Sequence, residues 1–166
     1  MQKIILSLLI LLSSQLMADF EGAATPEKIT EILVDLSKQP IGESGSWGGA
    51  IAIIDSNRSE RYAQFYPLRS GLINMEIPIA SSEDIFLTDD VVERLKDYLK
   101  GWKLQPEVSK RGGVYVDDGS TSSWRIMDVE LKISPSDYPK FINGLFLKCF
   151  GEKEPLDLTI SYAPEG

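Results

Sequence analysis

Three pairs of adjacent carboxylates could support acid–base chemistry: Glu83-Asp84, Asp89-Asp90 and Asp117-Asp118. Hydrolysis of a glycoside needs two carboxylates several ångströms apart across a cleft, and one of them needs a raised pKa. Adjacent residues do not provide that separation. Asp89-Asp90 is explained by its place in the first turn of a predicted helix, and Asp117-Asp118 by a predicted turn at Gly119. We therefore expect no catalytic residues and a protein that is not an enzyme.

Other catalytic and metal-binding chemistry is limited by composition. The chain has no histidine and a single cysteine, Cys149, which excludes Ser-His-Asp and Cys-His catalysis and a zinc cage. Asp117–Ser120 lacks the spacing of an EF-hand calcium loop. The glycines around Trp47 are not followed by the Lys-Ser or Lys-Thr pair of a phosphate-binding loop. We expect no metal and no cofactor, and Cys149 is predicted to be a buried structural thiol.

The first eighteen residues have the layout of a secretory signal peptide. Lys3 precedes the mostly apolar run Ile4–Leu12, and a cleavage site follows at Ala18. The alternative is an uncleaved anchor, but the run is far shorter than the ~20 residues of a membrane-spanning helix. We therefore expect cleavage after Ala18, a periplasmic or secreted protein without membrane contact, and a single domain at residues 19–166.

The charge of the chain is acidic and points to a class of partner. The sequence has 25 Asp and Glu residues against 17 Lys and Arg, a net charge of −8, which becomes −9 when Lys3 is removed with the signal peptide. Proteins that bind nucleic acid need a basic surface, so we expect no nucleic-acid partner. An acidic surface instead speeds capture of basic proteins.

Hydrophobic periodicity predicts three amphipathic helices, at about residues 26–38, from Thr88 to Gly101, and at about residues 134–150. Gly101 is predicted to take the left-handed conformation that closes a helix. The short lead Asp19–Ala24 is predicted to be mobile.

Alternating or β-branched runs predict strands. They are Ala50–Asp55, Glu60–Tyr66, Leu72–Ile79, Val114–Val116 and Met127–Ile133, with Leu156–Tyr162 as a further candidate. Pro78 suggests that its strand is at an edge or ends there. The order α-β-β-β-α-β-β-α(-β) predicts the α+β class, with a mostly antiparallel sheet of five or six strands and three helices over one face.

This order of elements over residues 25–150, together with the helix end Leu99-Lys100-Gly101-Trp102, resembles the type III secretion chaperone fold and related peptide-binding chaperone-like domains. The resemblance implies a non-enzymatic protein that binds another polypeptide, often as a dimer.

Side-chain alternation places a second set of residues on the face of the sheet away from the helices. If Met127 and Val129 point to the helices, residues at the intervening positions point away. The predicted partner-binding residues are Tyr62, Tyr66, Glu76, Trp124, Ile126, Asp128 and Glu130. Interfaces favour tyrosine and tryptophan, and acids steer a basic partner. The alternatives are an ordinary exposed antiparallel face or a face covered by a homodimer.

We therefore predict an exported chaperone- or adaptor-like domain that holds another polypeptide. One alternative is a periplasmic immunity-type inhibitor of a toxin. A second is a hydrolase that uses carboxylates in a site without a recognisable motif.

Overall fold

The computed structural model describes residues 19–40, 49–81, 85–114 and 121–164. The predicted signal peptide, Trp47 and its preceding glycines, Glu83-Asp84 and the turn at Asp117–Gly119 lie outside these ranges.

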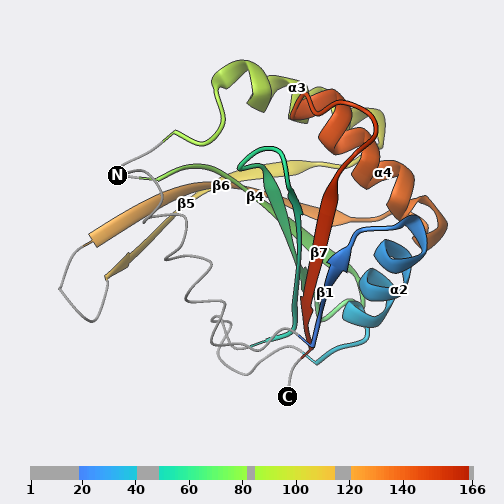
Figure 1. The fold of residues 1–166 in the computed structure, drawn as a ribbon. Helices are drawn as coiled ribbons and strands as arrows, with labels where there is room; N and C mark the ends of the chain where they lie inside the picture. Colours follow the sequence, from blue (N-terminus) through green and yellow to red (C-terminus); the bar gives the residue numbers. More distant parts are fainter. Residues whose placement is uncertain (1–18, 41–48, 82–84, 115–120, 165–166) are drawn as a thin grey trace.

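One antiparallel sheet of seven strands forms the scaffold, in the order β1-β7-β2-β3-β4-β6-β5 (Figure 1). The strands are β1 (Phe20–Ala23), β2 (Ile51–Ser56), β3 (Tyr62–Pro67), β4 (Ile73–Ser81), β5 (Pro106–Val114), β6 (Thr121–Leu131) and β7 (Leu158–Ala163). The helices of the described residues are α2 (Pro26–Leu36), α3 (Asp89–Gly101) and α4 (Tyr138–Gly144), which follows the short 3-10 turn η1 (Pro135–Asp137) and continues into the π-helical turn η2 (Leu145–Cys149). The predicted α+β class with an antiparallel sheet and three helices is therefore correct.

The helices lie together on one side of the sheet (Figure 1). Helix α2 begins as its sequence predicts: Thr25 Oγ1 accepts a hydrogen bond from the Lys28 amide at 3.3 Å, and Pro26 occupies the first turn. Its apolar stripe packs inward, with Ile29 and Leu33 fully buried. Burial of such a stripe against the sheet is what stabilises a helix of this length.

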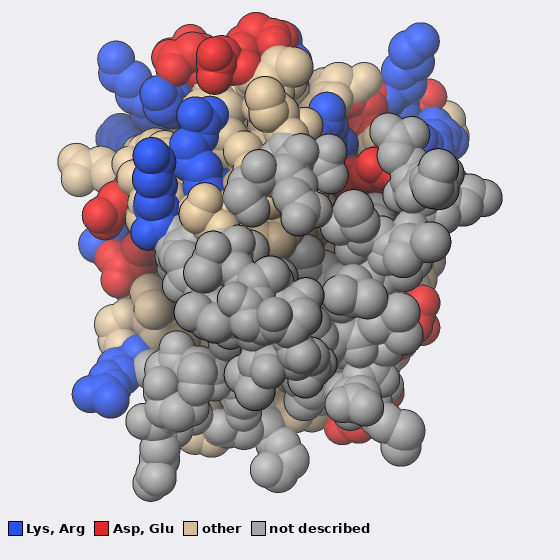
Figure 2. All heavy atoms as spheres, turned by 90° about the vertical axis from the view of Figure 1, so that its left-hand side faces the viewer, with Lys and Arg blue, Asp and Glu red and all other residues tan. Residues whose placement is uncertain are grey.

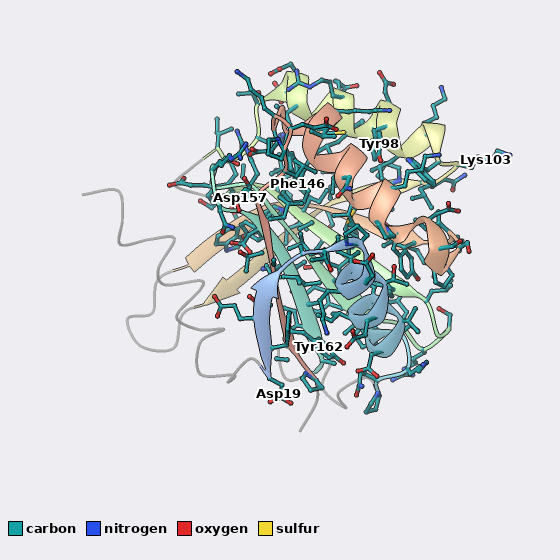
Figure 3. All side chains as sticks on the ribbon, turned by 45° about the vertical axis from the view of Figure 1, so that its right-hand side comes forward. Asp19, Tyr98, Lys103, Phe146, Asp157 and Tyr162 are labelled. Carbon is teal, nitrogen blue, oxygen red and sulfur yellow. The ribbon has the colours of Figure 1, made fainter. Side chains whose placement is uncertain are left out.

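Helices α3 and α4 contact each other where Tyr98 lies against Phe141 and Gly144. The Tyr98 hydroxyl of α3 donates a hydrogen bond to the Phe141 carbonyl at 2.7 Å, and its ring lies directly over Gly144. Figure 3 shows Tyr98 and Phe146 at this junction. Arg94 donates to the Cys149 carbonyl at 3.3 and 3.4 Å, which satisfies a carbonyl in the π-helical turn.

The core fills the space between the sheet and the helices. Its largest fully buried side chains include Phe65, Phe141 and Phe146, and Cys149 is buried among them, as predicted. Tyr162 of β7 donates a hydrogen bond to Asp35 of α2 at 2.5 Å, near the lower end of the sheet in Figure 3. Aromatic burial of this extent contributes a large share of domain stability.

The prediction of a mobile lead at Asp19–Ala24 is wrong. Phe20–Ala23 forms β1, which pairs with β7 along its whole length, and Phe20 packs against the core. This strand raises the number of strands to seven, beyond the predicted five or six. A four-residue strand has too few alternating positions to be recognised, and pairing with β7 is what makes it a strand.

The closure of α3 also differs from the prediction. Gly101 lies within the helix, and Lys103 instead has a positive φ of 58°. The amides of Lys103 and Leu104 donate to the Lys100 and Leu99 carbonyls at 2.9 and 3.0 Å. These hydrogen bonds hold a lysine in a conformation that usually favours glycine.

Two strand predictions need correction. Of the strand predicted at Val114–Val116, only Val114 is described; it ends β5, which begins at Pro106, whereas residues 115–116 lie outside the described ranges. Its partner β6 begins at Thr121, six residues before Met127. Pro78 lies within β4, an internal strand between β3 and β6, at a register shift between Pro78 and Ala80. A bulge accommodates a proline inside a sheet because the ladder is already interrupted there.

Candidate functional site

The outer face of the sheet consists of the strand positions that alternate with the buried core residues. On β3 these positions are Tyr62, Gln64 and Tyr66, between buried Ala63, Phe65 and Pro67. The structure brings all the sequence-predicted partner-binding residues to three neighbouring strands: Tyr62 and Tyr66 on β3, Glu76 on β4, and Trp124, Ile126, Asp128 and Glu130 on β6. Whether they bind a partner is addressed below.

One line of directly paired residues crosses the whole outer face, and we call it the acidic row. Its members, from β1 to β5, are Glu21, Ser161, Ile53, Gln64, Glu76, Asp128 and Glu107. Neighbouring strands lie about 4.8 Å apart, so the row is about 29 Å long. Four of its seven residues are acids and none is basic, which gives the outer face a negative centre line.

Asp128 is held in place by its neighbours. Its carboxylate accepts hydrogen bonds from Asn74 Nδ2 at 3.2 Å and from Ser109 Oγ at 3.0 Å. Glu76, directly opposite on β4, is only 7% exposed. Two acids therefore lie on directly opposite positions in the middle of the row.

Next to the acidic row lies a second line of paired residues, Asn74 opposite Glu130 and Tyr66 opposite Asn74. The Tyr66 hydroxyl donates to Gln64 Oε1 at 2.6 Å, which joins the two lines. Glu130 forms an ion pair with Lys132 of the same chain segment.

Burial and negative charge act together on titratable groups of this face. Burial, together with the nearby Glu76 carboxylate, raises the pKa of Tyr62 to about 12. Burial also raises the pKa of Asp55 on β2, a shift opposed by its own backbone hydrogen bond and increased by Glu21. A cation brought to this face would be favoured by the same negative field.

Trp124 lies at the far end of the predicted set, where β6 pairs with Ser81. Its ring stacks on Phe86, with centroids 5.6 Å apart and an interplanar angle of 14°. Ile85, adjacent to Phe86, is 77% exposed, the larger value of two exposed large hydrophobic residues in the described ranges. An aromatic pair and an exposed aliphatic side chain therefore lie at this end of the predicted set.

Two surface hollows lie away from the outer face. One, of about 410 Å³, is bordered by Lys38, Pro40 and Arg69 among others. The other, of about 530 Å³, is bordered by Asn143, Glu154 and neighbours. Neither brings two carboxylates together. In the described ranges, the carboxylates and Cys149 form no cluster of three or more that could hold a metal ion, and no helix there is long and apolar enough to cross a membrane.

Sequence reasoning missed three acids of the outer face: Glu21, Asp55 and Glu107. Glu21 and Glu107 lie on β1 and on the unpredicted part of β5, and Asp55 closes a strand read as apolar. The sequence carries no periodic signal for Glu21 or Glu107, because β1 and β5 become strands only through pairing with β7 and β6.

Figure 2 views the molecule from the left of Figure 1. Described acidic and basic side chains both lie around the margin of this view. The outward strand positions with described side chains differ, because they carry acids without lysine or arginine: Glu21, Asp55, Glu76, Glu107, Asp128 and Glu130. The described outward positions of the strands are therefore acidic.

Comparison with protein-family models, with curated proteins and with solved structures found no match for this chain. The resemblance to the type III secretion chaperone fold therefore remains a prediction, and the function is argued from the site alone.

Proposed function

We propose that this protein is an exported, non-enzymatic domain that holds another polypeptide on the outer face of its sheet. The observation that supports this most is the acidic row flanked by Tyr62, Tyr66 and Trp124. Rigid aromatic side chains anchor protein interfaces because they bury a large area at small entropic cost. Strands hold these anchors in fixed positions, which is the arrangement that recognition requires.

The partner that fits this face is basic. Six acids occupy its outward positions, and such a field raises the association rate of a cationic protein and disfavours acidic ones. An acidic face that attracts a basic protein would suit two roles. One is a chaperone or adaptor for a secreted client, and the other is an immunity-type inhibitor of a toxin. The identity of the partner decides between them. The hydrolase alternative is less well supported: the pKa of Asp55 is raised and Glu21 lies near it, but neither carboxylate borders either hollow.

The experiment is affinity capture by the mature protein, residues 19–166, from the periplasmic fraction of its source, followed by mass spectrometry. Three forms are compared: wild type, the double variant Trp124→Ala/Glu130→Lys, and Glu93→Lys. The control Glu93→Lys makes the same charge change as Glu130→Lys, but at an exposed residue of α3 on the other side of the sheet.

We expect one basic protein in fixed stoichiometry with wild type and Glu93→Lys, and its loss with the double variant. Circular dichroism and thermal unfolding establish that the double variant is folded. The proposal fails if all three forms retain the same proteins, or if a folded wild type retains none.

A further inference from the structure

An asparagine in the turn between β2 and β3 has the sequence context of a glycosylation acceptor. Asn57-Arg58-Ser59 matches the pattern Asn-x-Ser/Thr, in which the middle residue is any residue except proline. The other two asparagines of the chain, Asn74 and Asn143, do not match, because Glu76 and Leu145 follow them at the third position. A three-residue pattern is short, so its position in the fold decides whether it is usable.

The turn places this asparagine where a bulky group has room. Residues 57–60 are all exposed, and they connect the end of β2 to the start of β3. The Ser56 amide donates a hydrogen bond to the Arg61 carbonyl at 3.0 Å at the base of the turn. The exposed residues belong to neither strand, so a group attached there interrupts no strand pairing. Glycans on asparagine are bulky and solubilising and need such a surface position.

The side chain of Asn57 makes two hydrogen bonds that a glycan can leave in place. Its Nδ2 donates to Asp157 Oδ1 at 2.8 Å, and its Oδ1 accepts from Thr159 Oγ1 at 2.9 Å. An asparagine amide nitrogen carries two hydrogens. Attachment of a sugar replaces one of them and leaves the other for Asp157, which lies at the end of the sheet away from Tyr162 (Figure 3).

The residues that hold the turn in the folded protein come late in the chain. Asp157 follows Asn57 by 100 residues, and Glu152, which accepts a hydrogen bond from Ser59 Oγ at 2.5 Å, follows that serine by 93. A chain exported by an N-terminal signal peptide crosses the membrane with its N-terminus first. The acceptor residues therefore emerge before the residues that later hold them, and they are accessible to a transferring enzyme at that stage.

We propose that Asn57 is N-glycosylated during export of the chain. The donor is an oligosaccharide linked to a lipid diphosphate. A bond forms between Asn57 Nδ2 and C1 of the first sugar, the bond between C1 and the diphosphate oxygen breaks, and the lipid diphosphate leaves with that electron pair while one amide proton passes to a base. Bacterial enzymes of this class also need an acid two residues before the acceptor, and Asp55 stands there. The inference rests on export, which the proposed function shares, and not on binding of a partner.

Mass spectrometry of the exported protein tests this proposal. The full chain, with its signal peptide and a C-terminal tag, is produced in cells of its own source and purified from the exported fraction. Four forms are compared: wild type, Asn57→Gln, Ser59→Ala and Ser59→Thr. The last variant is the matched control, because threonine keeps both the acceptor pattern and the hydroxyl group. Circular dichroism establishes that all four forms are folded.

We expect wild type and Ser59→Thr to carry the added mass of one glycan on the peptide that contains residue 57, and Asn57→Gln and Ser59→Ala to have the mass of the polypeptide alone. A wild type without added mass, or an added mass that remains in Asn57→Gln, overturns the proposal. The result is separable from partner binding: an unmodified protein that captures its partner overturns this inference alone, and a glycosylated protein that captures none overturns the proposed function alone.

Discussion

Glu76 and Asp128 lie directly opposite each other on β4 and β6, at the centre of a row of paired residues that crosses all seven strands. Placing two acids on opposite positions of neighbouring strands is unfavourable for the isolated sheet. The Asp128 carboxylate accepts hydrogen bonds from Asn74 and Ser109, which fix its position. The two acids lie on a face that also carries Tyr62, Tyr66 and Trp124.

The two ends of the acidic row should affect the rate of partner capture. We expect Glu21→Gln and Glu107→Gln each to lower the association rate two- to threefold at low salt and to leave the dissociation rate unchanged, because remote charges steer encounters. Surface plasmon resonance with the captured partner, over a range of salt concentrations, measures both rates. A change confined to dissociation would mean that these acids make direct contacts instead.

Gly144 permits the contact between α3 and α4. A Cβ atom at this position would lie 2.2 Å from the Tyr98 hydroxyl oxygen and 3.0 Å from its ring. We expect Gly144→Ala to lower the free energy of unfolding by about 1–3 kcal/mol, as overpacking does. Urea unfolding measures the loss.

A matched control is available at the end of α3. A Cβ on Gly101 meets nothing within 4 Å, and this helical residue has no positive φ. Gly101→Ala should be neutral or stabilising by up to about 1 kcal/mol. If both alanine variants lose the same stability, the loss comes from a backbone effect and not from Tyr98.

The thiol of Cys149 should be unreactive in the folded protein. Burial raises its pKa to about 11, a shift that nearby Arg94 and Lys148 only partly oppose. The thiolate is the reactive form, so at pH 8 we expect almost no alkylation of the folded protein and complete reaction in urea. Since the folded state holds the proton more tightly, its stability should fall as pH rises from about 9 through about 11. Rapid alkylation without denaturant would contradict the buried position.

The tyrosines give a second alkaline signal. Burial raises the pKa of Tyr62 and Tyr98 to about 12, and raises that of Tyr138 and Tyr162 above its ordinary value of 10.0. Asp35, which accepts a hydrogen bond from Tyr162, adds to the shift at that residue. In an ultraviolet titration we expect three of the six tyrosines, Tyr62, Tyr98 and Tyr162, to remain protonated at pH ~11 in the folded protein, whereas all six ionise near pH 10 in urea. Simultaneous ionisation in both conditions would count against the packing of these rings.

The elements that could be predicted were those whose apolar residues recur with a helical or strand period. The apolar residues of helix α2 recur with the helical period and those of strand β6 recur at every second position, so the buried side of each can be assigned from the sequence. For β6 this assignment places Ile126, Asp128 and Glu130 together on the outer face. Strands β1 and β5 could not be recognised, because Phe20–Ala23 is short and Pro106–Val114 contains charges and two glycines. Both become strands through pairing with β7 and β6, and pairing is a long-range property.

For the candidate site, the sequence could predict which residues share the outer face but not how they are arranged on it. Alternation alone assigns a side chain to a face, and it does not say which residues lie opposite one another. The acidic row appears only when the registers of all six strand pairs are known. Glu21 and Glu107 are far apart in the chain, and they enter the same line because each lies on a strand that the sequence did not reveal.

The central claim is that the outer face holds another polypeptide, and isothermal titration calorimetry tests it most directly. The purified partner is titrated into wild type, Trp124→Ala/Glu130→Lys and Glu93→Lys. We predict a loss of affinity of about 100-fold or more in the double variant, which removes an aromatic anchor and reverses a charge, and a change of less than about twofold in Glu93→Lys. Equal affinity of wild type and the folded double variant would contradict the account and place the binding surface elsewhere on the molecule.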